Sequence, residues 1–141
     1  MVRQRVMLGP SRLDVAFAWF QRLMAAYCLL LGVFYWVRLI GIYPGALWRF
    51  DLMPMHWRTV SATLAVLFPF AAAGLWMLTS WGPVIWFICA ATETVMYAGF
   101  PQLFGERRAI VTAHVLVALV YLAFRVVLHL RDRRASRETA A

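Results

Sequence analysis

The sequence predicts an all-α, polytopic membrane protein whose fold is a bundle of four transmembrane helices. Of the 141 residues, 64% are hydrophobic and only 14% are charged, whereas a soluble domain is about 45–50% apolar and about 25% charged. The chain also contains four long apolar stretches, and a helix needs about 20 such residues to cross a bilayer. A chain of this length is expected to form a single domain.

The four apolar stretches set the expected domain organisation. They cover residues 15–42, 59–79, 84–100 and 109–130. Each is expected to be helical, because backbone groups in lipid must form their hydrogen bonds within the segment itself. The transmembrane domain is therefore predicted at 15–130, between an N-terminal segment at 1–14 and a polar, frayed tail at 131–141.

Local signals mark where the predicted helices begin and end. Ser11 followed three residues later by Asp14 matches a capping box at the start of the first helix. Residues 80–83, with the sequence Ser-Trp-Gly-Pro, predict a tight turn, since proline suits the first turn of a following helix. Pro101 and Gly105 are expected to end the third span. Pro69 falls inside the second span, where it is expected to kink the helix.

The distribution of arginine predicts the orientation. The net charge is +8 and all 14 basic residues are Arg, a usage that hints at a GC-rich bacterial genome. Arginines flank the first and last spans more heavily than the loops at 43–58 and 101–108, and positive charge favours the cytoplasmic side. Both termini are therefore expected in the cytoplasm of a bacterium, with the chain in the inner membrane. Positive charge placed at span ends predicts lipid headgroup contacts and no nucleic acid partner.

Four residues are predicted to anchor the bundle at the membrane interfaces. Arg22 and Arg38 lie near opposite ends of the first span, where their long side chains could reach the headgroups. Trp48 and Trp57 belong to the longest loop, and tryptophan favours the headgroup level. This loop is expected to lie along the outer interface.

Two ionisable residues lie deep inside predicted spans. Glu93 is about 10 Å below the outer end of the third span and His114 about 8 Å below the outer end of the fourth, at 1.5 Å per residue. The two spans are joined by a short loop and should pack antiparallel. We therefore expect a hydrogen bond or ion pair between Glu93 and His114.

The fourth span carries further polar residues on the same face as His114. Tyr121 and Arg125 fall with it inside about a 60° arc of the helix, so the four residues form an expected intramembrane polar cluster: Glu93, His114, Tyr121 and Arg125. One interpretation is structural, because polar side chains join helices in lipid. The other is a proton or substrate pathway, because an imidazole beside a carboxyl group can exchange protons near neutral pH.

No cofactor or metal is predicted. Cys28 and Cys89 lie inside apolar stretches without metal-ligand spacing and are expected to pack as small apolar residues. Residues 53–56, Met-Pro-Met-His, offer soft ligands of the kind that suit Cu(I), but a single cluster of this type favours an interfacial loop. His114 and His129 lie on one helix, too far apart to bind one haem iron from both sides.

The run from Trp48 to Met55 and the region around Glu93 give the chain a family resemblance. The chain resembles small uncharacterised four-helix inner-membrane proteins of alphaproteobacteria, over roughly residues 10–132. The resemblance implies the four-helix fold and no known activity. Small multidrug transporters also have four helices and a membrane glutamate, but theirs lies in the first span, where this chain has none.

The sequence favours a non-enzymatic accessory or scaffold subunit of a membrane assembly, since it is small, has short loops and carries no catalytic motif. The alternative is a small proton-coupled transporter that uses Glu93 and the face of His114, Tyr121 and Arg125. A membrane enzyme or quinone-binding subunit is the least favoured, because no nucleophile, metal set or cofactor motif is present. The expected partners are the lipid bilayer and either another membrane protein or a second copy of the chain.

Overall fold

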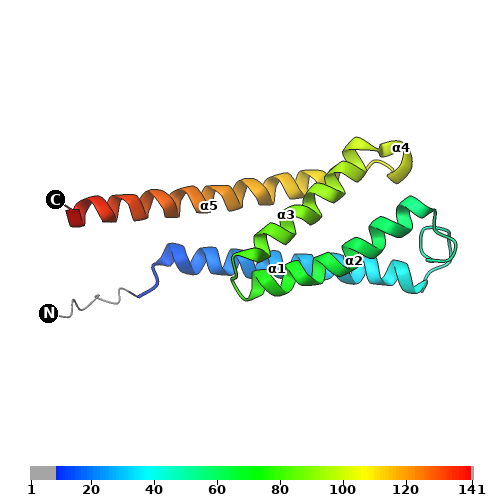
Figure 1. The fold of residues 1–141 in the computed structure, drawn as a ribbon, viewed down its shortest axis with the longest axis horizontal. Helices are drawn as coiled ribbons and strands as arrows, with labels where there is room; N and C mark the ends of the chain where they lie inside the picture. Colours follow the sequence, from blue (N-terminus) through cyan, green and yellow to red (C-terminus); the bar gives the residue numbers. More distant parts are fainter. Residues whose placement is uncertain (1–8, 141) are drawn as a thin grey trace.

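The computed structural model describes residues 9–140, with side chains described as far as residue 137, and this part of the chain is helical without strands (Figure 1). The start of α1 and the end of α5 lie at the same end of the molecule. The elements in chain order are α1 (Arg12–Ile40), α2 (Met55–Trp76), α3 (Trp81–Thr94), the π-helix η1 (Val95–Gly99), α4 (Pro101–Phe104) and α5 (Arg108–Ala140).

Three helices are long and apolar enough to cross a membrane: α1, α2 and the part of α5 that runs from Arg108 to Arg137. The chain is therefore a membrane protein. The third predicted span, at 84–100, corresponds to α3 and η1. Alone, α3 has 14 residues, which is shorter than the roughly 20 that a span needs.

The capping box at the start of α1 is present as predicted. The Ser11 side chain accepts a hydrogen bond from the Asp14 backbone N–H, and the Asp14 carboxylate accepts one from the Ser11 backbone N–H. At the other end, Gly41 adopts φ 78°, a left-handed conformation that glycine adopts without steric cost. α1 accordingly ends at Ile40, close to the expected end at residue 42.

Close contacts between small residues join the first three helices. A Cβ atom at Gly32 of α1 would lie 2.9 Å from Pro69 Cδ of α2, and one at Gly82 of α3 would lie 2.5 Å from the backbone carbon of Gly74 of α2. The absence of side chains at Gly74 and Gly82 lets the two helix backbones approach each other directly, as small residues do in membrane bundles. Contact between α1 and α2 is the most extensive in the molecule, followed by that between α2 and α3.

The α-helical geometry of α3 gives way to a π-helical turn, in which the Phe100 N–H bonds the Val95 oxygen, five residues back, at 3.1 Å. Phe100 itself leaves helical geometry, with φ −129° and ψ 57°, because proline disfavours the helical conformation in the residue before it. The short helix α4 then begins at Pro101 and ends at Gly105, whose φ is 82°. The loop expected at 101–108 thus contains one helical turn.

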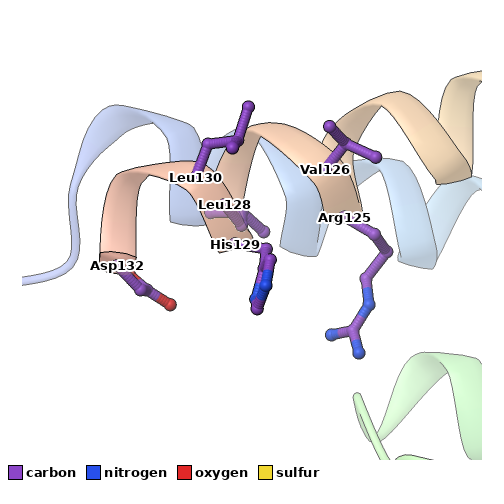
Figure 2. Close-up of a pocket in the computed structure, with 6 residues that line it drawn as sticks. All are labelled: Arg125, Val126, Leu128, His129, Leu130 and Asp132. Atoms are coloured by element: carbon purple, nitrogen blue, oxygen red, sulfur yellow. The ribbon is translucent and has the colours of Figure 1, made fainter. Parts of the chain in front are cut away.

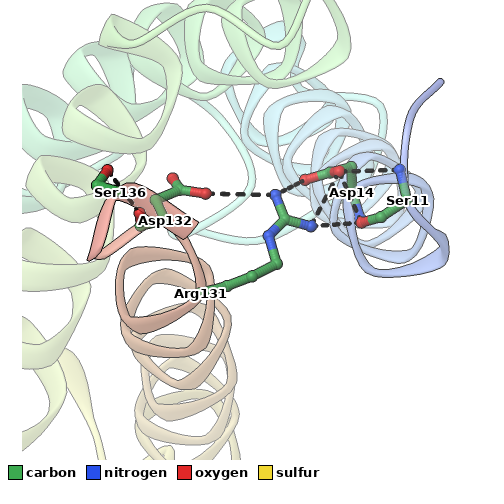
Figure 3. Close-up of polar contacts among 5 residues, drawn as sticks. All are labelled: Ser11, Asp14, Arg131, Asp132 and Ser136. Carbon is green, nitrogen blue, oxygen red and sulfur yellow. Dashed lines mark hydrogen bonds and ion pairs between the residues drawn. The ribbon is translucent and has the colours of Figure 1, made fainter. Parts of the chain in front are cut away.

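The expectation of a frayed tail after residue 130 is wrong for the described residues. α5 continues as a helix to Ala140, because the sequence there is rich in Arg and contains Ala, and both residues favour helix. Arg131 also ties this extension to α1: its guanidinium donates hydrogen bonds to both carboxylate oxygens of Asp14, at 3.0 and 3.1 Å, and to the Ser11 hydroxyl (Figure 3). Residue 141, and Arg3 and Arg5 of the predicted N-terminal segment, lie outside the described residues.

Candidate functional site

Glu93 is the centre of a buried polar cluster that joins three helices. Its carboxylate lies in α3 and is 1% exposed. The hydroxyl of Tyr35, on α1, donates a hydrogen bond to Glu93 Oε1 at 2.5 Å, and His114 Nε2, on α5, lies 2.6 Å from Glu93 Oε2. Tyr35 and His114 are 1% and 3% exposed. The polar triad formed by Tyr35, Glu93 and His114 is therefore shielded from solvent and lipid alike.

The chain brings the triad together through helix direction and depth. α3 and α5 are joined by η1, α4 and a short connection, so the two helices run antiparallel (Figure 1). Glu93 therefore meets His114 at one level. The expected contact between these two residues is present. Tyr35 reaches the same level from α1. This helix packs mainly against α2, and α2 in turn packs against α3.

The surroundings of the triad are apolar and aromatic. Cys28 and Cys89 are fully buried and are free thiols. The ring centroids of Tyr27 and Trp86 lie 6.3 and 6.2 Å from that of His114. Interactions between the triad members are consequently stronger than they would be in water, since the local dielectric constant is low.

The hydrogen bonds of the triad use both carboxylate oxygens of Glu93. A hydroxyl on one oxygen and an imidazole nitrogen on the other satisfy the carboxylate without a cation from outside the chain. The second ring nitrogen of His114, Nδ1, has no hydrogen-bond partner among the described residues. Chemically, the arrangement can hold three helices together, and it can also share a proton between the carboxylate and the imidazole.

The structure does not join Tyr121 and Arg125 to the triad. The Tyr121 ring packs between Phe17 of α1 and Phe87 of α3, with centroid distances of 5.8 and 5.9 Å. Arg125 is exposed on α5 and lines a cavity of about 540 Å³ near the opposite end of that helix, together with His129 (Figure 2). The common helix face was predicted from the 3.6-residue period, but Tyr121 meets aromatic rings there and extends no polar chain toward Arg125.

Arg38 does not reach the headgroups as an anchor, and this prediction is wrong. The residue is 1% exposed, and its guanidinium carbon lies 5.1 Å from the Phe34 ring, 5.1 Å from the Trp48 ring and 4.6 Å from the Trp57 ring. The segment after α1 folds back over the end of the helix and brings Trp48 and Trp57 onto the cation. Such cation–π contacts become stronger when the cation is desolvated.

The other predicted anchors differ in how they are placed. Trp57 is 3% exposed and donates a hydrogen bond to the Leu103 carbonyl oxygen at 3.1 Å, so it is a core residue and no surface anchor. Trp48 is half-buried beside Arg38. Arg22 is half-buried between the rings of Trp19 and Trp76, both more than half exposed. The role of Arg22 as a membrane anchor stays a prediction.

The loop between α1 and α2 is held by local polar contacts. Arg49 donates hydrogen bonds to both carboxylate oxygens of Asp51, at 3.2 and 2.7 Å, and these bonds lower the pKa of the Asp51 carboxyl. Met53 is buried, whereas the His56 ring packs edge-on against Phe104. Of the three soft ligands in residues 53–56, Met53 and His56 are engaged in packing, whereas Met55 is 73% exposed.

Tyr35 is the triad member that the sequence did not reveal. It lies on the buried stripe of α1 that also carries Gln21, Ala25, Cys28 and Gly32, a pattern typical of helix packing in membranes. The one available signal was the hydroxyl itself, since a buried tyrosine usually finds a hydrogen-bond partner.

Comparison with known proteins gives one family match. No curated protein and no solved structure matches the chain. The model of a family of unknown function, DUF6163, matches residues 15–132. This range includes the three residues of the triad and most of each of the three helices that could cross a membrane. The chain therefore belongs to the DUF6163 family of unknown function.

Proposed function

We propose that this protein crosses a bacterial inner membrane four times, with both termini in the cytoplasm, and serves as a non-enzymatic accessory or scaffold subunit of a larger membrane assembly. For the third crossing, α3 runs directly into η1. At about 1.5 Å per residue the two together extend close to the roughly 30 Å of a hydrocarbon core. The excess of arginine beyond the first and last helices supports the orientation.

The observation that carries the accessory role is that the intramembrane polar groups bond one another. Glu93, His114 and Tyr35 are almost completely buried and together satisfy the carboxylate. A transported substrate would need to reach such groups through an accessible cavity, and these three side chains offer it almost no surface. The triad is therefore best explained as a clasp that fixes α1, α3 and α5.

The outer surface of α5 supports a role in assembly. His114 is its only buried residue between residues 108 and 137, so most of the helix faces away from the bundle. Its exposed apolar side chains are Val115, Leu116, Leu119, Val120, Leu122, Val126, Val127 and Leu130. In a bilayer this surface can meet lipid or a helix of another subunit.

Co-purification tests the accessory role. A photo-crosslinking residue placed at Leu119, on the exposed face of α5, should capture a specific membrane protein in cells, and the same partner should remain after extraction in a mild detergent. The matched control is the same residue at Leu64, which is fully buried and should capture nothing outside the chain. A monomer that yields no crosslink from Leu119 contradicts the proposal.

A second candidate function is proton-coupled transport, and one specific observation favours it. Glu93 and His114 place two titratable groups 2.6 Å apart in the membrane interior. Purified protein in vesicles would then carry a pH-driven flux that Glu93→Gln abolishes. A flux that the substitution leaves unchanged excludes this function.

A further inference from the structure

Two cations and a buried hydroxyl gather at the outer end of the bundle. Arg38 is on α1, Tyr97 is on η1, and Arg107 directly precedes α5. The Arg107 guanidinium carbon lies 6.0 Å from the Tyr97 ring, and Arg38 interacts electrostatically with both Tyr97 and Arg107. We call these three residues the outer cluster.

Two members of the outer cluster, Arg38 and Tyr97, have buried donors without a hydrogen-bond partner among the described residues. Arg38 is 1% exposed, yet its Nε and Nη1 atoms form no hydrogen bond with any described residue. Tyr97 is 4% exposed. Its hydroxyl lies near Tyr35 but forms no hydrogen bond of ordinary geometry. Three aromatic rings surround the guanidinium, but none of them carries an oxygen or nitrogen acceptor for its N–H groups. Buried donors of this kind are normally satisfied, so a ligand is expected here.

No carboxylate in the described chain balances the two cations. Glu106 is paired with Arg108 at 3.2 Å, and Asp51 is paired with Arg49 at 2.7 Å. Both carboxylate oxygens of Glu93 are already hydrogen-bonded, one to Tyr35 and one to His114. Arg38 and Arg107 therefore repel each other, and a bound anion would relieve this repulsion.

A cavity opens beside Tyr97, the one member of the outer cluster that lines it. It has a volume of about 360 Å³ and lies where η1, α4 and α5 meet. Tyr97 lines it together with Arg108 and Thr112, and Glu106 lies at the same opening. The π-helical turn is what carries Tyr97 here, and π-helical turns are frequent at functional sites.

We propose that the outer cluster binds an oxyanion of the phosphate type, supplied either by a free inorganic anion or by the headgroup of an anionic lipid. Guanidinium groups bind such anions through paired N–H donors, and the Tyr97 hydroxyl adds a third contact. The depth suits a headgroup, because Arg38 is two residues from the end of α1, or about 3 Å along the axis. The site is independent of the accessory role, since it uses no member of the triad.

Thermal unfolding of the full-length, delipidated protein in a non-ionic detergent tests the site. Sulfate or phosphate replaces gluconate at constant ionic strength in one arm, and phosphatidylglycerol replaces a neutral glycolipid in the other. We expect Tm to rise by about 5 °C at saturating ligand. A rise in the first arm identifies a free oxyanion, and a rise only in the second identifies a lipid headgroup; either result supports the site.

The variants localise the effect. Tyr97→Phe keeps the ring and removes the hydroxyl, and should weaken the apparent affinity about tenfold. Arg38→Gln should abolish the Tm shift, and Arg49→Gln, at the same end of the molecule and with the same change in charge, is the matched control that should retain it. The proposal is overturned if neither arm shifts Tm, or if Tyr97→Phe responds to the ligand as the wild type and Arg49→Gln do. Tyr97→Phe keeps the test decisive if Arg38→Gln does not fold.

Discussion

The Tyr35 hydroxyl and the Glu93 carboxylate are separated by 58 residues in the sequence and joined by a 2.5 Å hydrogen bond in the structure. This bond connects α1 to α3, two helices that share few other contacts. Because His114 occupies the other oxygen of Glu93, loss of Tyr35 would leave one oxygen of a buried carboxylate without a partner.

We predict that Tyr35→Phe lowers the free energy of unfolding by about 1 kcal/mol, the typical net value of a hydrogen bond that joins membrane helices. Unfolding by sodium dodecyl sulfate in mixed micelles, followed by circular dichroism, measures the change. Tyr43→Phe is the matched control, because Tyr43 is 55% exposed. Equal stability of the two variants would contradict a role for the Tyr35 hydroxyl.

The contact between Gly74 and Gly82 predicts that α2 and α3 tolerate no added side chain. In Gly82→Ala the new Cβ would lie 2.5 Å from the backbone of Gly74 and Leu75, so the helices would have to separate. We expect a loss of about 1–3 kcal/mol in unfolding free energy, measured in the same assay. Gly99→Ala serves as the control, because the nearest side-chain atom would be 3.8 Å away; a similar loss there would contradict the assignment.

The proposed orientation predicts opposite accessibility of two exposed positions. Asp51, between α1 and α2, should face the periplasm, and Ser80, between α2 and α3, should face the cytoplasm. A membrane-impermeant thiol reagent should label Asp51→Cys in intact cells and label Ser80→Cys only after the membrane is opened. The native Cys28 and Cys89 are fully buried and should stay unlabelled. Labelling of Ser80→Cys in intact cells would reverse the topology.

The ion pair between Arg131 and Asp14, which joins α5 to the start of α1, predicts a salt-sensitive contribution to stability. Arg131→Gln removes the hydrogen bonds to Asp14, and these side chains are partly exposed. A small loss of stability is expected at low salt, and it should shrink as salt screens the pair. Arg133→Gln, on the same exposed part of α5, is the control for net charge. A loss that does not change with salt concentration would contradict the ion pair.

Features set by local sequence were predictable. The Ser11–Asp14 capping box depends on residues three apart. The apolar stretches predicted the ends of α1, α2 and α5 to within a few residues, except for the C-terminal end of α5. The meeting of Glu93 and His114 followed from a short connection and equal depth. These inferences need only helix geometry and neighbouring elements.

Features set by distant contacts were not predictable. Arg38 looked like a headgroup anchor because its burial depends on a loop that folds back and places Trp48 and Trp57 on it. Tyr35 looked like a packing residue because nothing near it in sequence indicates which residue of α3 it meets. The length of α5 was underestimated because a charged segment reads as a tail, although its composition favours helix and Arg131 fixes it to α1.

The most direct test of the clasp is a double-mutant cycle on Glu93 and His114. The unfolding free energy is measured for the wild type, Glu93→Gln, His114→Asn and the double variant in one mixed-micelle system. The account predicts that the two side chains stabilise each other by about 1 kcal/mol, so that the double variant loses less than the sum of the single losses. Single losses that add within about 0.3 kcal/mol would contradict it.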